Sequence, residues 1–496
     1  MNYGVIANVL GYLLLVEAGL MVPSLLVALY YSSYDWKGIL FSIIVTGIVG
    51  FIMTRIFKYR ENIRVKEGLA IVGFGWILVS IFGALPFIFS GTIPSWIDAF
   101  FETVSGFTTT GASIVDDIEA FPKGVLFWRS FTHWIGGMGI LVFTVALLPM
   151  LGIGGFQIYK TESPGPTPDR IVPRVRDTAK ILYTIYIIIT IVNFILLVLG
   201  GMSPYDSALH TFGTVGTGGF GIKSKSVGYY QSTYIHLVIA IFMTLCGANF
   251  SLYYLLYKGK WREVVKNTEL RFYLGTIFLS VILIALNILG PMDYNSFGIA
   301  LRDSFFQVAS IITTTGYTTV DFDKWPTFSK VILFALMFMG GCAGSTAGGI
   351  KNIRIVVLLK AIKREFYRIL HPRAVLPIKI DGKVISSNTV AGIASFFVLF
   401  MFIFIISTII VSLDGVDFES SASAVAATLG NVGPAFGFAG PARSYSGFSN
   451  LSKLILSGCM LLGRLEIFTL MILFNPAFWR YEAFSRNYKK INGNIK

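Results

Sequence analysis

The sequence predicts an all-α polytopic membrane protein. We expect four repeated units of span, re-entrant pore helix and span around a pseudo-fourfold pore, plus two extra N-terminal transmembrane helices. Of the 496 residues, 54% are hydrophobic and 13% are charged, and the mean hydropathy is +0.72, a balance that soluble globular domains do not show. Apolar runs long enough to cross a bilayer recur from end to end, and four shorter ones each lead into a loop rich in glycine or threonine.

Ten apolar stretches are near or above the ~20 residues that a helix needs to cross a bilayer, and they lie at 5–31, 37–57, 69–90, 124–150, 178–200, 231–257, 271–290, 328–360, 389–412 and 451–475. Four others are too short to cross, at 97–109, 205–216, 302–314 and 419–430. A chain that stops halfway must return through a loop, and such backbone survives at that depth only where it lines a water-filled cavity. We therefore predict four re-entrant half-helices.

The basic residues predict the orientation. If the N-terminus is cytoplasmic, the inside segments hold 29 of the 40 Lys and Arg residues, at 55–68, 151–180, 258–271, 351–383 and 476–496. Positive charge accumulates on the cytoplasmic side of membrane proteins, so both termini are expected in the cytoplasm. Because these residues lie in short links between spans, the net charge of +14 does not indicate nucleic-acid binding.

A fourfold internal repeat organises the chain after its first two spans. The short stretches align on one glycine each, about a hundred residues apart, at Gly111, Gly219, Gly316 and Gly433. The predicted division is a two-helix hairpin at 1–66 and pore repeats at 67–160, 161–262, 263–370 and 371–496, the last with a cytoplasmic tail. Thirteen residues before each glycine stands a preferred helix N-cap, which predicts where each half-helix begins, at Asp98, Asp206, Asp303 and Ser420.

The loops that end the half-helices are composed for cation binding. Small residues let backbone carbonyls face a common axis, and four such loops would form rings of oxygens that replace the hydration shell of a monovalent cation. The predicted filter residues are Thr109, Thr110, Gly111, Thr217, Gly218, Gly219, Thr314, Thr315, Gly316, Asn431, Val432 and Gly433. Close helix packing is the alternative use of such stretches, but it gives no reason for four recurrences after a half-length helix.

At this point the chain resembles the Trk/Ktr/HKT superfamily of potassium uptake channels and transporters, and its TrkH branch in particular. The resemblance covers essentially the whole chain and rests on the four loops, the run from Gly340 to Lys351, the segment from Leu462 to Glu466, and the two extra N-terminal spans. It implies potassium as the preferred permeant ion, with K⁺ bound at the filter only, in the inner membrane of a prokaryote. Loops two and four depart from the Thr-Thr-Thr-Gly pattern, a variation usual in this superfamily.

The span 328–360 contains a glycine-rich interruption. Five glycines in ten residues weaken a helix by up to ~1 kcal/mol each, so a broken helix is expected at Gly340, Gly341, Cys342, Ala343, Gly344, Ser345, Thr346, Ala347, Gly348 and Gly349. Counted from its filter glycine, this run falls on the cytoplasmic side of the filter, and the resemblance implies that it is the gating loop. A close helix-packing face through every fourth residue is the alternative.

Arg464 and Lys351 are the candidate pore barrier. Arg464 follows its filter glycine by the same interval as Ala347 follows Gly316, so the two can meet at one depth. A buried arginine in a membrane is costly and usually functional. The alternatives are a structural ion pair with Glu466, and for Lys351 a side chain that reaches to the membrane surface.

Other polar residues inside the spans receive weaker assignments. Glu17 lies outside the repeats, where packing is favoured over a proton site. One equivalent position, nine residues before the filter glycine, is expected to hydrogen-bond behind the filter, at Glu102, His210 and Gln307. His133 has no partner histidine at metal-ligand spacing, and Arg129 is interpreted as an anchor at the outer end of its span.

Two transport mechanisms fit these features. The first is a gated potassium-selective channel, and the alternative is a proton- or sodium-coupled potassium symporter. No catalytic motif indicates an enzyme, and a structural scaffold would not need repeated half-helices. The basic segments predict contact with anionic lipids, and the resemblance implies a homodimer with a cytosolic ring of nucleotide-binding RCK-domain subunits. Because the glycine run lacks a phosphate-loop ending, no cofactor is expected on this chain, and ATP or NAD would act through that partner.

Overall fold

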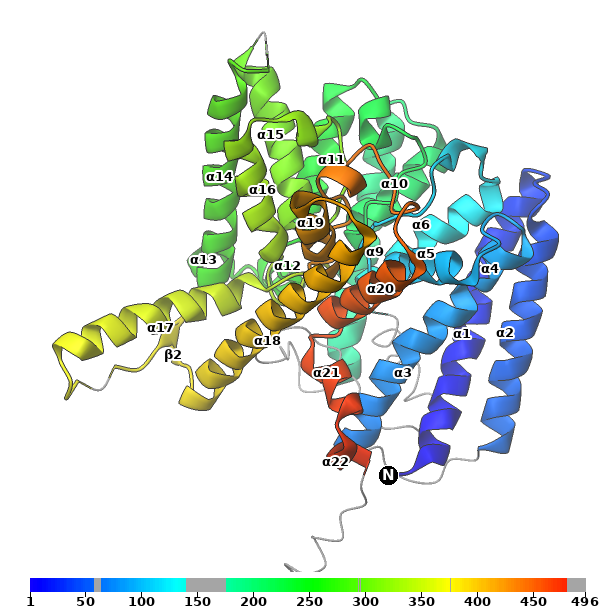
Figure 1. Cartoon of the computed structure of the whole chain (residues 1–496), viewed down its shortest axis with the longest axis horizontal. Helices are drawn as coiled ribbons and strands as arrows, with labels where there is room; N and C mark the ends of the chain where they lie inside the picture. The colour runs from blue at the N-terminus through cyan, green and yellow to red at the C-terminus, as the bar shows by residue number, and fades with distance from the viewer. Residues whose placement is uncertain (58–63, 140–174, 293, 295, 375, 480–496) are drawn as a thin grey trace, which may run out of the picture.

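The computed structural model describes residues 1–57, 64–139, 175–292, 294, 296–374 and 376–479 (Figure 1). Within these ranges the chain is predominantly helical. The strands β1 (Lys379–Ile380) and β2 (Lys383–Val384) pair antiparallel in one short hairpin. The expectation of an all-α membrane fold therefore holds in outline.

The N-terminal hairpin consists of α1 (Tyr3–Tyr30) and α2 (Trp36–Ile56) at one edge of the molecule (Figure 1). A methyl group added at Gly50 would lie 2.9 Å from the carbonyl oxygen of Gly11, so the two backbones pack closely. Asp35 joins the hairpin to the rest of the fold, because its carboxylate accepts a hydrogen bond of 2.7 Å from the Val125 amide.

The remaining helices follow in chain order. Those of the first half are α3 (Val65–Gly83), α4 (Leu85–Phe89), α5 (Trp96–Phe107), η1 (Ile118–Ala120), α6 (Lys123–Gly137), α9 (Val175–Leu199), α10 (Pro204–Gly216), η3 (Ser226–Tyr229), α11 (Thr233–Cys246), α12 (Phe250–Tyr257) and α13 (Trp261–Lys266). Those of the second half are α14 (Thr268–Ile288), α15 (Phe297–Ile312), η4 (Phe322–Lys324), α16 (Thr327–Phe338), α17 (Asn352–Leu370), α18 (Ser387–Val411), η5 (Ser412–Asp414), α19 (Phe418–Leu429), η6 (Gly437–Ala439), α20 (Asn450–Arg464), α21 (Phe468–Met471), η7 (Ile472–Phe474) and α22 (Pro476–Trp479).

The membrane spans are less regular than the ten predicted. Among the described residues, six helices are long and apolar enough to cross a membrane, or up to eight if each sharply bent pair counts as one span. The predicted span 231–257 bends by 92° between α11 and α12, and 451–475 bends by 112° after α20. The expected break in 328–360 is present between α16 and α17, and the end of 124–150 lies outside the described residues.

The predicted N-caps of the half-helices are wrong. In three of the four helices the cap stands three residues earlier, at Ser95, Ser203 and Asp417, and its side chain accepts from the backbone amides of Asp98, Asp206 and Ser420. These predicted residues are therefore the third residues of their helices. An acid at that position complements the positive end of the helix dipole, which explains why Asp98 and Asp206 are at the start of a helix without capping it.

The helix α15 differs from the other three, because it begins earlier. Its cap is Ser296, which accepts from the Gly298 amide, so Asp303 lies inside the helix instead of at its start. There the Asp303 carboxylate accepts from Arg302 Nε at 2.8 Å and from the Tyr294 hydroxyl at 3.2 Å. At the cap of α19, hydrogen bonds from Ser420 lower the pKa of the Asp417 carboxyl below its ordinary value.

The half-helices pack in a closed order. Each of α5, α10, α15 and α19 packs against the helices before and after it in the chain. Each also packs against one further helix, which follows a different half-helix in the chain: α6 on α10, α11 on α15, α16 on α19, and α20 on α5. Because the last contact returns to the first half-helix, segments far apart in the sequence enclose one common centre.

Candidate ion pathway

The four loops that follow the half-helices share one backbone conformation. The residue two before each glycine has a left-handed φ, with values of 55° at Thr109, 53° at Thr217, 56° at Thr314 and 56° at Asn431. The glycines themselves have φ of 82°, 77°, 86° and 99° at Gly111, Gly219, Gly316 and Gly433. Residues other than glycine seldom adopt positive φ, so its recurrence at four equivalent positions indicates a common constraint.

Neighbouring loops meet at these glycines. A side chain at each one would run into the carbonyl oxygen of the residue before the glycine in another loop: Gly111 into Gly218, Gly219 into Thr315, Gly316 into Val432, and Gly433 into Thr110. The contacts therefore pass from loop one to two, three, four and back to one. All four glycines also line one cavity of about 220 Å³. The sequence prediction of four convergent loops agrees with this geometry.

A buried ion pair supports the first two loops. Glu102 accepts from Arg129 Nε at 2.6 Å, and both side chains are at least 96% buried. The same carboxylate accepts from Ser113 Oγ and the Ile114 amide at 2.9 Å each. Arg129 also donates to the Gly221 carbonyl at 3.0 Å and stacks over the Phe220 ring. Glu102 thus hydrogen-bonds to the segment after Gly111, as expected, whereas Arg129 is a buried partner of Glu102 and not an anchor at the end of its span.

His133 joins a half-helix to the second loop. Its Nδ1 is 2.7 Å from the Gly106 carbonyl oxygen, and its Nε2 accepts from the Phe220 amide at 3.2 Å. The spacing of histidines along the sequence, which bears only on metal binding, did not predict this role. The signal was available, because a buried histidine must find partners for two ring nitrogens.

Two tyrosines support the remaining loops. Tyr317 follows Gly316, and its hydroxyl donates to the His210 carbonyl at 3.2 Å. The Tyr445 hydroxyl donates to the Gly433 carbonyl at 2.7 Å. His210 stacks against the Tyr317 ring, while Gln307 donates to Thr319 Oγ1 at 3.4 Å. Glu102 and Gln307 thus hydrogen-bond to the segments that follow Gly111 and Gly316, as predicted, whereas the His210 ring nitrogen Nδ1 bonds to the Asp206 carbonyl of its own helix.

The fourth loop reaches across to the first. Asn431 Nδ2 donates to Thr110 Oγ1 and to the Met460 carbonyl, at 2.9 Å each. The amide NH₂ group supplies two donor hydrogens, whereas a threonine hydroxyl supplies one. The departure of loop four from the Thr-Thr-Thr-Gly pattern therefore has a structural use.

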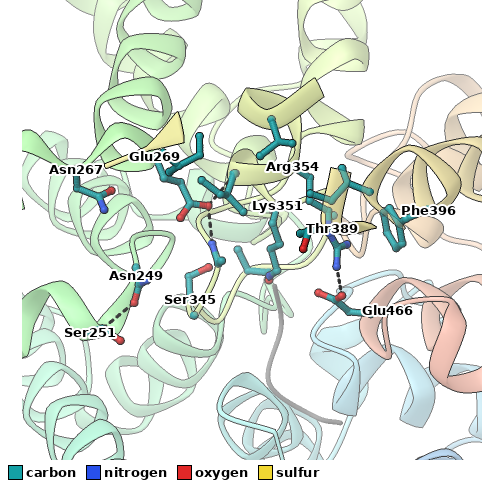
Figure 2. Close-up of a pocket in the computed structure, with 18 of the residues that line it drawn as sticks. Asn249, Ser251, Asn267, Glu269, Ser345, Lys351, Arg354, Thr389, Phe396 and Glu466 are labelled. Atoms are coloured by element: carbon teal, nitrogen blue, oxygen red, sulfur yellow. Dashed lines mark hydrogen bonds and ion pairs between the residues drawn. The ribbon is translucent and has the colours of Figure 1, made fainter. Parts of the chain in front are cut away.

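The glycine run between α16 and α17 is a folded loop. A hydrogen bond of 2.9 Å from the Gly340 amide to the Ile350 carbonyl closes its ends. The Cys342 amide donates to the Gly247 carbonyl at 2.8 Å, at the bend between α11 and α12. Glu269 of α14 accepts from the amides of Ala343 at 2.7 Å and Ile353 at 2.9 Å (Figure 2). Because the run is not helical, the alternative of a helix-packing face is wrong.

This loop lies directly against two of the four loops that follow the half-helices. The Gly348 amide donates to Thr314 Oγ1 at 2.6 Å. A methyl group added at Gly348 would lie 2.7 Å from Cβ of Asn431. The glycine run thus contacts loops three and four through backbone that carries no side chain.

Arg464 is placed where the glycine run, the first loop and α6 meet. It donates to the Thr346 carbonyl at 2.8 Å, to the Gly137 carbonyl at 3.0 Å, to Thr109 Oγ1 at 3.3 Å, and to the Gly136 carbonyl. The predicted proximity to the glycine run is confirmed. Glu466 forms an ion pair with Arg354 of α17 (Figure 2).

Lys351 turns inward instead of reaching for the membrane surface. Its side chain is buried and donates to the Ala347 carbonyl. It lines a second cavity of about 550 Å³ together with Arg354, Arg464 and residues of the glycine run. This cavity shares no lining residue with the one at the filter glycines. The alternative of an end-of-helix lysine that snorkels is therefore wrong.

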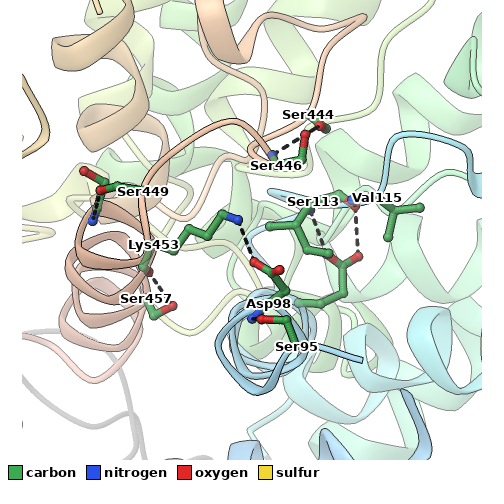
Figure 3. Close-up of polar contacts among 12 residues, drawn as sticks. Ser95, Asp98, Ser113, Val115, Ser444, Ser446, Ser449, Lys453 and Ser457 are labelled. Atoms are coloured by element: carbon green, nitrogen blue, oxygen red, sulfur yellow. Dashed lines mark hydrogen bonds and ion pairs between the residues drawn. The ribbon is translucent and has the colours of Figure 1, made fainter. Parts of the chain in front are cut away.

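A part-buried ion pair joins the first and last parts of the chain. Lys453 of α20 donates to Asp98 of α5 at 2.6 Å (Figure 3). Lys453 was not among the predicted functional residues, although a lysine inside an apolar span is a signal of such a role. Glu17, by contrast, faces α3, because a methyl group added at Gly83 would lie 3.0 Å from its Oε1. The Glu17 carboxyl has no hydrogen-bond partner among the described residues.

Comparisons with known proteins agree with this arrangement. The model of the TrkH family, described as a cation transport protein, matches residues 36–481. The chain belongs to the TrkH family. The Trk system potassium uptake protein TrkH of Escherichia coli K12 is 38% identical over 97% of this chain and all of its own length, and TrkG of the same organism is 35% identical over 96% of this chain and 98% of its own.

A solved structure has the same fold. The crystal structure of the potassium transporter TrkH from Vibrio parahaemolyticus superposes with a TM-score of 0.86 at 36% identity, covering 97% of this chain and all of that one. Family membership confirms the resemblance seen in the sequence. It also agrees with the expectation that the chain is a transport protein and not an enzyme.

Proposed function

We propose that this chain is a potassium-selective uptake pore. Membership of a cation transport family and relatives named as potassium uptake proteins support this function. The observation that carries it is the cyclic contact of four loops with one backbone conformation. In this proposal the repeats at 67–160, 161–262, 263–370 and 371–496 surround a pseudo-fourfold axis, and the hairpin at 1–66 stands outside them.

The filter works by replacing water around the ion. The backbone carbonyls of the residues at and before the four glycines supply oxygens to a dehydrated cation, and K⁺ binds nowhere else on the chain. The C-terminal ends of the half-helices direct their partial negative charge toward the same place. The buried pair Glu102–Arg129 and the contacts of His133 and Tyr445 hold the carbonyls at a fixed spacing.

The glycine run is the gate, and the basic side chains beside it are the barrier. Gly340–Gly349 blocks the pathway between the two cavities, while Arg464 and Lys351 add positive charge that repels a cation there. Opening requires the loop to leave Thr314 and Arg464 to leave Thr346. The glycine-rich backbone lowers the free energy needed for this change of loop conformation, because glycine can adopt the widest range of backbone angles.

The assembly extends beyond this chain. We propose a homodimer in the inner membrane of a prokaryote, with both termini in the cytoplasm, as the distribution of Lys and Arg supports. A cytosolic ring of RCK-domain subunits would bind ATP or NAD and move the gate. The basic segment 351–383 would contact anionic lipids or that ring.

The test is cation flux into liposomes that contain only the purified chain, measured for K⁺, Rb⁺, Na⁺ and Li⁺ with and without a pH gradient. Passive K⁺ and Rb⁺ flux above Na⁺ flux is expected. Gly111→Ser should remove the selectivity. Gly91→Ser is the matched control, because Gly91 has a similar φ of 74° but no atom within 4 Å of an added Cβ.

Two outcomes would overturn the proposal. Flux that requires a proton or sodium gradient would favour the symporter instead. Selectivity lost equally in Gly91→Ser and Gly111→Ser would show that the glycine contact between loops is irrelevant to the filter.

A further inference from the structure

The four residues that stand two before the filter glycines have the same backbone but different side-chain partners. Thr314 Oγ1 accepts from the Gly348 amide of the glycine run at 2.6 Å. Thr217 Oγ1 instead donates to the Gly216 carbonyl of its own loop at 2.7 Å. Both side chains are fully buried. Two chemically identical hydroxyls at equivalent positions therefore differ in whether they hold the gate.

The contact at Thr314 links two functions through one oxygen. A hydroxyl oxygen has two lone pairs, and an amide that donates to it uses one of them. A cation that bound the same oxygen would meet the positive end of the Gly348 N–H dipole. Cation binding to the Thr314 oxygen and the hydrogen bond from Gly348 to that oxygen therefore disfavour each other electrostatically.

Other contacts around the gate point in the same direction. Arg464 donates to Thr109 Oγ1 at 3.3 Å and to the Thr346 carbonyl at 2.8 Å, so a guanidinium also lies at this level beside loop one. Gly348 packs against Asn431 of loop four. With the gate loop in place, three of the four equivalent positions are in contact with the gate or with Arg464.

We propose that the Thr314 hydroxyl is a positioning residue that couples the filter to the gate. It holds Gly348 when the loop is closed and becomes a ligand of the innermost cation when the loop withdraws. This inference rests on the proposed pore function. It follows from linkage that a K⁺ ion bound at this level favours the open loop by the same factor by which the open loop favours K⁺.

The experiment compares Thr314→Val with Thr217→Val, which remove the same hydroxyl at the same level of two loops. Resting Rb⁺ flux into liposomes with the purified full chain alone should rise about fivefold in Thr314→Val, the population change expected for one typical buried hydrogen bond. Resting flux in Thr217→Val should stay well below that in Thr314→Val, because the Thr217 hydroxyl bonds within its own loop and not to the gate. Thr276→Val is the control for basal flux, because the Thr276 hydroxyl donates to the Phe272 carbonyl within α14 and lies in neither the filter nor the gate; its resting flux should stay within about twofold of the unmodified chain. Thr314→Ser, which keeps the hydroxyl, should behave as the unmodified chain.

Selectivity separates the failure of this inference from the failure of the pore. Thr314→Val and Thr217→Val should both lower the ratio of K⁺ to Na⁺ flux, since each removes one oxygen near the ion. Altered selectivity in both, with equal resting flux, would overturn the coupling and leave the filter standing. No change of selectivity in either would overturn the proposed function itself.

A second measurement needs no filter substitution, in case Thr314→Val does not fold. Cys342 lies in the gate loop and is 1% exposed. In a chain with Cys246→Ser and Cys459→Ser, a small methanethiosulfonate should label Cys342 faster in KCl than in LiCl, because bound K⁺ favours the open loop. Equal labelling rates in the two salts would overturn the inference.

Discussion

The buried pair of Glu102 and Arg129 should be among the largest single contributions to the stability of the pore. Arg129→Leu removes the 2.6 Å bond to Glu102 and the 3.0 Å bond to the Gly221 carbonyl. The Glu102 carboxylate would remain buried with only Ser113 and the Ile114 amide as donors. Leaving a buried charge without its partner costs about 3–5 kcal/mol.

The chain itself suggests the compensating substitution. In the first repeat, Glu102 stands nine residues before Gly111 and Arg129 stands 18 residues after it. In the third repeat, the same positions relative to Gly316 are occupied by Gln307 and Phe334. Glu102→Gln with Arg129→Leu copies this uncharged arrangement. Because neither charge is then buried, we expect the double variant to recover most of the lost stability.

The assay is thermal unfolding of the purified protein in detergent. Arg129→Leu should lower Tm by about 6–10 °C at ~2 °C per kcal/mol for a chain larger than 150–250 residues, with a smaller loss in the double variant. Lys260→Met is the control, because the exposed pair of Lys260 and Glu263 contributes at most about 1 kcal/mol. If the losses of Arg129→Leu and Glu102→Gln, each measured alone, simply add in the double variant, the ion pair does not stabilise this part of the fold.

Three further predictions test other parts of the structure. Gly316→Ala should abolish K⁺ selectivity, because an alanine at φ 86° is strained and its methyl group would displace the Val432 carbonyl. An unchanged ratio of K⁺ to Na⁺ flux into liposomes would contradict this. Ser203→Ala should lower the free energy of unfolding by about 1 kcal/mol through loss of the α10 cap, and an unchanged Tm would mean that the helix is capped otherwise. Glu17→Gln should leave K⁺ flux and its pH dependence unchanged, since Glu17 lies outside the filter and gate, whereas a loss of pH dependence would favour proton coupling.

Local signals made much of this protein readable from its sequence. The helical membrane fold follows from apolar length and a low share of charge, which the bilayer imposes on any chain that crosses it. The four loops were found because the same short pattern recurs at intervals of about a hundred residues. The break at Gly340–Gly349 and the proximity of Arg464 to this glycine run were also predicted, since glycine content and distance along a helix are local properties.

The helix caps and the bends in two spans were decided by tertiary structure. The sequence predicts Asp98 as a helix N-cap, but the N-cap of α5 is Ser95. The Asp98 carboxylate instead accepts a hydrogen bond from Lys453, which is 355 positions further along the chain. The span 231–257 has ordinary apolar composition, yet it bends where the Gly247 carbonyl accepts a hydrogen bond from the Cys342 amide of the glycine run.

The partners of the buried polar groups also depend on the folded chain. Arg129 finds Glu102, His133 finds Phe220, and Thr314 finds Gly348, over separations of 27, 87 and 34 residues. Sequence determines which segments must enter the membrane, because transfer of apolar surface is a property of each segment alone. Which donor meets which acceptor is determined only when those segments pack, because a buried polar group must be satisfied by whatever the fold brings to it.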